Sequence, residues 1–159
     1  VDIAVTIERP PNTSLVVSRL CDYRLTMYAS QEYLRSHKAI RRIEDVYDHP
    51  LIGYIDDLTF SDQLAYLERL IPDAKPVYRS TSVITQYIGA RSGLGLAVLP
   101  CFLARDADNL VPILEDVTSV FRTFWIAAHP EHKKLARVDK VWQCLKKHAD
   151  SSRGILMGE

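Results

Sequence analysis

Polar side chains that could bind a ligand gather at two places, each directly after a short apolar run. The run 51–55 is followed by two aspartates and Thr59, and the run 76–79 is followed by the Ser-Thr-Ser triplet 80–82. Each place predicts a helix start, where free backbone N–H groups and the positive end of the helix dipole can hold a small anion or polar metabolite. Capping of the helices alone, or a structural turn at the aspartates, is the competing interpretation.

Patterns for catalytic, phosphate and metal chemistry are weak. The sequence contains no Gly-x-Ser-x-Gly elbow and no Walker lysine. The Gly-Leu-Gly of 93–95 follows a predicted helix and precedes a predicted strand, which is the wrong order for a dinucleotide fingerprint. His129 and His132 lack the spacing and third ligand of a helical zinc motif. No CxxC occurs among the three cysteines, Cys21, Cys101 and Cys144. We therefore expect a binding site without catalysis, metal or cofactor.

The apolar pattern predicts the elements that must position these side chains. Strands are expected at 1–7 (buried on both faces), 15–20, 23–29, 51–55, 76–79, 96–99, 110–114 and 120–128. Helices are expected after Ser30, at 43–47, at 59–71, after Ser82 and at 130–149. Ser30 and Ser82 are the expected N-caps, and Thr59 with Asp62 is the expected capping box. Gly93 is expected to end the helix after Ser82 in a left-handed conformation, and the chain is expected to fray from Ser151. Strands and helices alternate from 51 to 99, which predicts an α/β fold with a largely parallel sheet covered by helices.

Length and charge limit the function classes. The 159 residues suffice for one compact domain or two small lobes, and 20 basic residues balance 20 acidic ones. A dedicated nucleic-acid module would normally be basic, so the chain alone is a poor candidate for one. No apolar run approaches the roughly 18 residues of a membrane helix. The chain opens within a predicted buried strand and without Met, so we expect a fragment.

Several segments together resemble the middle of a LysR-type transcriptional regulator. The most specific is 89–100, which ends Gly-Leu-Gly-Leu-Ala-Val-Leu-Pro and is similar to the glycine-turn-strand-proline signature of that family. The others, in matching order and spacing, are 1–5, 15–20, 25–30 with Tyr33-Leu34, 49–52, and 125–129 followed by the terminal amphipathic helix. The resemblance covers about Val1 to Ala149.

The resemblance implies a periplasmic-binding-protein-like effector region, with a mixed, mostly parallel α/β sheet flanked by helices. It implies a partial first subdomain and hinge at 1–15, a complete second subdomain at 16–128, a return to the first subdomain at 129–150, and a tail at 151–159. It further implies a small-molecule effector and no catalytic activity. The full-length regulator would bind DNA only through a missing N-terminal domain and would form homo-oligomers (dimer or tetramer). It would lie in the cytoplasm, without membrane association.

The resemblance also implies which residues contact the effector. Residue by residue, the matching positions are Thr6, Asp57, Leu58, Thr59, Phe60, Thr81, Ser82 and Val83. Asp56 and Asp57 argue against a polyanionic effector because like charges would repel in a poorly hydrated cleft. A transport-type solute-binding protein and a small flavodoxin-like enzyme are the alternatives.

Overall fold

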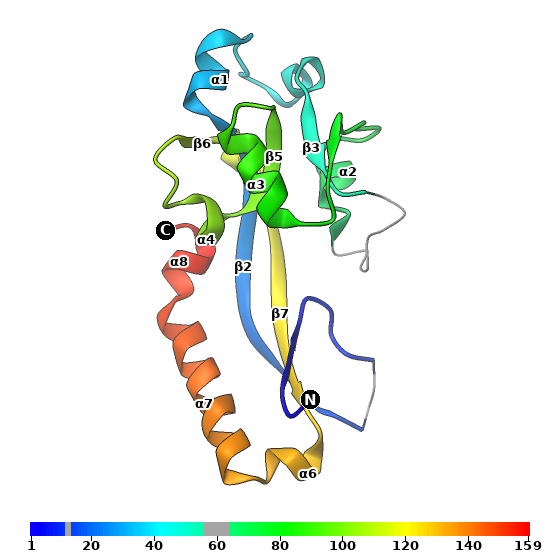
Figure 1. Ribbon diagram of the computed structural model, residues 1–159, viewed down its shortest axis with the longest axis vertical. Coiled ribbons are helices and arrows are strands. Elements are labelled where there is room, and N and C mark those ends of the chain that lie inside the picture. The colour runs from blue at the N-terminus through cyan, green and yellow to red at the C-terminus, as the bar shows by residue number, and fades with distance from the viewer. Residues whose placement is uncertain (12–13, 56–63) are drawn as a thin grey trace.

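The computed structural model describes residues 1–11, 14–55 and 64–159. The molecule is elongated, with an upper and a lower lobe joined by the two long strands β2 (Val16–Ser30) and β7 (Val120–Ala128) (Figure 1). These strands pair antiparallel from Val16↔Ala128 to Leu25↔Val120. Most of the other described elements pack on this strand pair or extend the sheet that it starts.

The sheet is mixed, and its parallel part is confined to the upper lobe. Its order is β1-β7-β2-β5-β3-β4, with β6 also pairing to β2. Among the described pairings only β3–β4 and β3–β5 are parallel. The mixed α/β class is confirmed, but the expected parallel majority is wrong, because the long antiparallel strands carry most of the pairing. The shorter strands are β1 (Ala4–Thr6), β3 (Leu51–Gly53), β4 (Tyr78–Arg79), β5 (Leu96–Pro100) and β6 (Leu110–Ile113).

The two strands expected at 15–20 and 23–29 form the single strand β2. Cys21 and Asp22 do not break it but pair with Phe124 and Thr123. The register shifts between Arg19 and Cys21, so a bulge there absorbs the extra residue. The continuous partner β7 supplies backbone hydrogen bonds throughout, and these override the local turn signal.

Helices surround the sheet of the upper lobe. They are α1 (Gln31–Ser36), the 3-10 helix η1 (Ile43–Asp48), α2 (Tyr66–Leu70), α3 (Val83–Arg91), α4 (Cys101–Ala104) and α5 (Glu115–Thr118). The core beneath them contains fully buried side chains from β2 and β5, among them Leu25, Met27, Leu96 and Val98. Of the helix expected at 59–71, the described residues show α2, and the expected Thr59/Asp62 capping box lies outside them. Ile71, the C-cap of α2, is buried against the same core, as its apolar stripe predicts.

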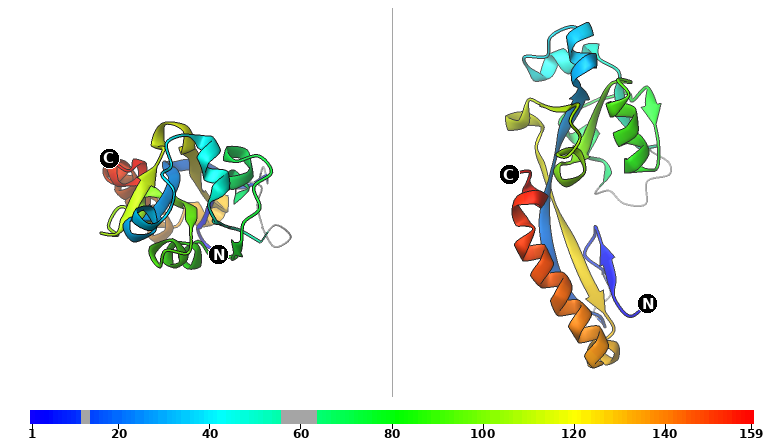
Figure 2. Two further views of the ribbon diagram at one scale, coloured as in Figure 1. Left: turned by 90° about the horizontal axis from the view of Figure 1, so that it is seen from above. Right: turned by 60° about the vertical axis from the view of Figure 1, so that its left-hand side comes forward.

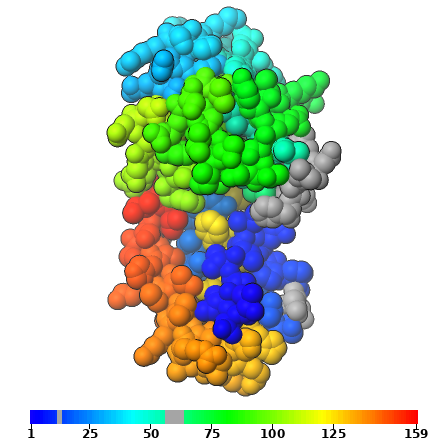
Figure 3. Space-filling view, viewed as in Figure 1, coloured from blue at the N-terminus to red at the C-terminus, as the bar shows by residue number. Residues whose placement is uncertain are grey.

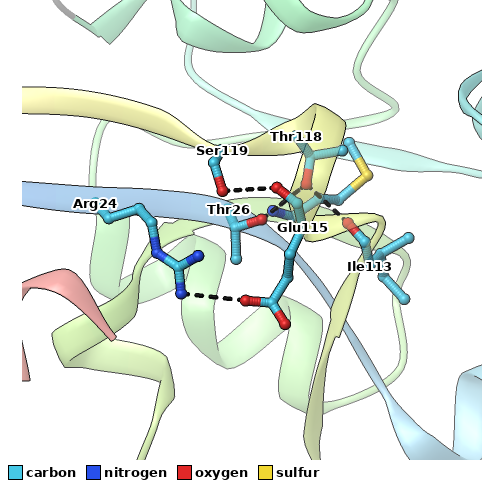
Figure 4. A network of polar contacts seen from close by, with 7 residues as sticks. Arg24, Thr26, Ile113, Glu115, Thr118 and Ser119 are labelled. Atoms are coloured by element: carbon cyan, nitrogen blue, oxygen red, sulfur yellow. Dashed lines mark hydrogen bonds and ion pairs between the residues drawn. The ribbon is translucent and has the colours of Figure 1, made fainter. Parts of the chain in front are cut away.

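A buried hydroxyl network fastens α5 to β2 (Figure 4). Thr26 Oγ1 lies 2.7 Å from Thr118 Oγ1, which also donates to the Ile113 carbonyl at 2.7 Å. Both threonines are completely buried. Arg24 extends the network by donating to Glu115 at 3.1 Å.

The lower lobe contains β1 and the C-terminal helices. One helix was expected at 130–149, but the chain forms α6 (Pro130–Lys133) and α7 (Ala136–Ser151), with Leu135 as the non-helical cap between them. The expected frayed end is wrong, because α8 (Arg153–Met157) follows at once and packs on the upper lobe (Figure 2). Val138 and Trp142 of α7 are buried on the lower part of the sheet.

Strand β1 is not buried on both faces as expected. It pairs with β7 alone among the described strands, and Val5 leaves 49% of its surface exposed. An edge strand, which pairs with a single neighbour, is more exposed to solvent than the central strands β2 and β5. Within the part of the chain that the structure describes, no helix has the length and apolar character needed to cross a membrane.

Candidate functional site

The start of α3 is built from the Ser-Thr-Ser triplet 80–82. Ser82 is the N-cap, as predicted, and its Oγ accepts from the Thr85 N–H at 3.4 Å. Ser80 Oγ accepts from the Ser82 N–H at 3.1 Å, and the Ser80 N–H donates to the Gly53 carbonyl at 3.0 Å. These bonds tie the helix start to the end of β3. Thr81 and Ser82 remain exposed, so a ligand could reach both hydroxyls.

Gln86 supports this helix start from beneath. Its side chain is only 1% exposed, and its Nε2 donates to the Ser80 carbonyl at 3.2 Å. A buried amide is stable only when it is hydrogen-bonded, so this contact holds the loop before α3 in one conformation. Gln86 was not among the predicted site residues. A polar residue on the inner face of a predicted helix is nevertheless a sequence feature that could have indicated it.

The start of α3 lies on the side of the upper lobe that faces the lower lobe. In Figure 1 the parallel strands β3 and β5 both end at this side, and the segment after β1 rises toward it from below. In Figure 3 the blue residues of the chain start lie below the green surface of the upper lobe, with yellow atoms of β7 visible in the hollow between them. The site therefore faces the space between the lobes, at the carboxyl ends of parallel strands, where ligands of such sheets bind.

On the lower side of this space, an open cavity of about 460 Å³ lies between the segment after β1 and β7. Its lining is Ile7, Glu8, Arg9, Phe121, Arg122, Thr123 and Trp125. Thr6 precedes this lining, pairs with Trp125, and donates from Oγ1 to the Glu8 carbonyl at 2.6 Å. The Arg9 guanidinium lies 5.7 Å from the ring centroid of Trp125, a distance typical of a cation–π contact.

Arg122 gives the cavity a half-buried positive charge. Its Nη1 donates to the Phe121 carbonyl at 2.9 Å. Burial lowers the pKa of Arg122, and the nearby Arg69 lowers it further, while Tyr23 and Tyr66 act in the opposite direction. An arginine remains protonated even when its pKa is lowered in this way. Partial burial of its charge costs free energy, and an anionic group close to the guanidinium would reduce that cost.

The structure brings some of the predicted site residues toward one space and leaves others untested. Thr6 lies beside the cavity, and Thr81, Ser82 and Val83 form the start of α3, but none of the four lines the cavity itself. Asp57, Leu58, Thr59 and Phe60 lie outside the described residues. Arg9 and Arg122 were missed; the signal for Arg122 was a charged residue inside the predicted strand 120–128.

The histidines 129 and 132 fit the structural interpretation of a helix start. His129 is the N-cap of α6, and its Nδ1 accepts from the Glu131 N–H at 3.3 Å. Among residues 1–11, 14–55 and 64–159, no group of three or more His, Cys, Asp or Glu side chains is placed to hold a metal ion.

Comparison with known proteins identifies the family. Residues 1–150 match the family model described as the LysR substrate binding domain. No curated protein matches the chain in sequence.

Solved structures show the same fold. The regulatory domain of CrgA, a LysR-type transcriptional regulator from Neisseria meningitidis, superposes with a TM-score of 0.76 at 23% identity, over 94% of this chain and 76% of that one. The regulatory domain of the C227S variant of AphB from Vibrio vulnificus gives 0.69 at 16% identity, over 92% and 78%. Full-length AphB from Vibrio cholerae gives 0.72 at 18% identity over 93% of this chain, which spans only 52% of that protein.

Proposed function

The chain belongs to the LysR substrate-binding-domain family, and from this membership we propose that a small polar metabolite binds between its two lobes and changes the conformation of a transcriptional regulator. The chain is the regulatory, effector-binding region of a LysR-type regulator, and the family consists of regulatory domains, not enzymes. The metabolite and its binding residues are the proposal.

The observation that carries the proposal is the placement of polar groups on both sides of the space between the lobes. The hydroxyls of Thr81 and Ser82 lie above it, and Thr6, Arg9 and Arg122 lie at its lower side. A ligand that touches both sides interacts best with one particular lobe arrangement. It therefore shifts the population of conformations and causes no chemical step.

The charges favour a ligand with one acidic group and several hydroxyls. Asp56 and Asp57 argue against a polyanion, while Arg9 and Arg122 can hold one negative charge at the lower side. We propose that the polar end is held by the hydroxyls of Thr59, Thr81 and Ser82. Asp57, Leu58, Phe60 and Val83 complete the wall, and the two apolar side chains Phe60 and Val83 shield the rest of the ligand.

A thermal-shift screen of metabolites on the full-length regulator tests this site. Ser82→Gly removes the hydroxyl but keeps most of the capping tendency, and Thr59→Val removes the second hydroxyl. Each loss should weaken the identified metabolite roughly 5–10-fold, the value of one hydrogen bond. Ser30→Gly is the matched control, because Ser30 caps α1 in the same way at the far end of the upper lobe. If Ser82→Gly and Thr59→Val both bind with unchanged affinity, the site is wrong.

The properties of the whole regulator are also proposals, because the chain spans only about half of the full-length relative. We propose that the regulator binds DNA through an N-terminal domain, assembles as a dimer or tetramer, and acts in the cytoplasm. The segment 61–70, which contains α2, is the proposed contribution of the upper lobe to the dimer. Sedimentation of the chain and of the full regulator would test this; equally strong dimers would contradict a need for further segments.

A further inference from the structure

We propose that the chain carries a second binding site, for a small carboxylic acid, in a cavity between β2 and the helices α7 and α8. The cavity measures about 650 Å³, against about 460 Å³ for the one between the lobes. It lies along β2, whereas the cavity between the lobes lies along β7, so the two flank the same strand pair (Figure 1). The site is thus separate from the one in the proposed function.

The charges on the β2 wall neutralise one another. Arg19 Nε donates to Asp22 Oδ1 at 3.0 Å, and the same oxygen accepts from Thr123 Oγ1 at 2.6 Å. The thiol of Cys21 adds no negative charge, because burial, with a smaller effect of Asp150, raises its pKa. This wall therefore places no net charge in the cavity.

The helix wall carries an excess of positive charge. Lys146 Nζ donates to a neutral partner, Ser18 Oγ, at 2.9 Å. Arg153 forms no ion pair or hydrogen bond through its side chain with any residue that the structure describes. Asp150 is the acidic residue on this wall. Two cations against one anion favour a ligand with a single negative charge, and a carboxylate matches the planar donors of Arg153.

The remaining lining is apolar and selects an acid with a hydrocarbon body. Leu20 from β2, Ala149 from α7 and Met157 from α8 complete the wall. Each methylene that leaves water on such a surface tightens binding by up to about fourfold. A chain of a few carbons behind the carboxylate therefore fits the site better than an inorganic anion.

Occupancy of this cavity would act on the hinge, because its walls are attached to both lobes. Helix α7 packs through Trp142 on the lower sheet, next to Ile126. Helix α8 is anchored in the upper lobe: Leu156 packs on the upper core, and Gly158 lies directly against Cys101. A ligand held between β2 and these two helices would favour one relative position of the lobes.

Calorimetric titration of the 159-residue chain with butyrate, hexanoate and hexanamide tests the proposal. Hexanoate should bind several-fold more tightly than butyrate because it buries two more methylenes. Hexanamide should bind at least tenfold more weakly because it lacks the charge. Arg153→Gln should weaken hexanoate on the order of tenfold. Arg137→Gln is the matched control, because Arg137 is exposed on α7 away from the cavity and should leave binding unchanged.

Two results would overturn the proposal. One is equal binding of hexanoate and hexanamide, or equal effects of Arg153→Gln and Arg137→Gln. The other is a loss of hexanoate binding in Ser82→Gly but not in Arg153→Gln, which would place the acid between the lobes. Failure of the effector site leaves this test intact, because Arg153→Gln changes the lining of the α7–α8 cavity alone and Arg137→Gln changes neither site.

Discussion

The buried hydroxyl network between β2 and α5 makes a sharp prediction about stability. Thr118 has one hydroxyl proton, and it donates that proton to the Ile113 carbonyl, which can only accept. Thr26 must therefore be the donor in the 2.7 Å contact between the two hydroxyls. The two threonines thus have unequal roles: Thr118 serves three partners, because its Oγ1 also accepts from the Met27 N–H at 3.4 Å, and Thr26 serves one.

Replacing Thr118 by Val keeps the shape of the side chain but leaves the Thr26 hydroxyl and the Ile113 carbonyl without their partner, and it removes an acceptor of the Met27 N–H. Both lie in a region without solvent access, so the free energy of unfolding should fall by about 2–3 kcal/mol. Thr26→Val removes one donor, and Thr118 keeps its bond to Ile113, so the expected loss is about 1 kcal/mol. In the Thr118→Val background, Thr26→Val should cost nothing or restore stability, because it removes a stranded hydroxyl.

Urea unfolding of the four proteins, followed by circular dichroism, measures this cycle. The midpoints should shift at an unchanged slope, since the area exposed on unfolding hardly changes. Ser119→Ala is the control, because the Ser119 hydroxyl donates to the Glu115 carbonyl at an exposed position and should change stability by less than about 0.5 kcal/mol. Equal losses for Thr26→Val and Thr118→Val, or strictly additive ones, would refute the assigned direction of the hydrogen bond.

Three further predictions concern the C-terminal helix, pH and DNA. Gly158→Ala should release α8 and speed its proteolysis, because Gly158 has φ +77° and a Cβ would lie 2.8 Å from Cys101 Cβ. The left-handed backbone alone costs about 1–2 kcal/mol with a side chain. Gly154→Ala should not have this effect, because a Cβ there would meet Glu159 Cβ at 4.0 Å, an ordinary contact. Burial lowers the pKa of His49, whose Nδ1 lies 2.7 Å from the Tyr33 hydroxyl. As pH falls, the unfolded chain therefore takes up the His49 proton before the folded chain does, and the free energy of unfolding should decrease below about pH 6.5. His49→Gln keeps an acceptor for Tyr33 and should flatten this dependence in urea titrations at several pH values; an unchanged slope would contradict it. The chain alone, with a formal net charge of zero, should show no sequence-specific, salt-sensitive retention of promoter DNA in a gel shift.

Local features of the fold could be predicted from the sequence. Ser30 and Ser82 cap α1 and α3 as expected, and Gly93 adopts a left-handed φ of +75° after α3. Each of these depends on hydrogen bonds between residues at most five apart, such as the Leu94 N–H to the Gly89 carbonyl. The residue types in a short window determine such bonds, so an isolated sequence contains the information.

The order of motifs along the chain also indicated the family, and with it the function class. The segment 89–100 and the segments around it carry that signal, and the family match over residues 1–150 confirms it. The sequence likewise predicted the helix start at Thr81 and Ser82, which forms one side of the proposed site, because a helix start after a strand has the same free backbone N–H groups in any such fold.

Only the tertiary structure decided which distant residues meet. The β2–β7 register joins Asp22 to Thr123, the β1–β7 register sets Thr6 opposite Trp125, and the docking of α8 brings Gly158 onto Cys101. Register between strands about a hundred residues apart depends on the whole set of pairings and on the bulge at Arg19, which no local window contains. For this reason the caps could be predicted from the sequence, whereas the cavity with Arg122, the cavity with Arg153 and the continuous strand β2 could not.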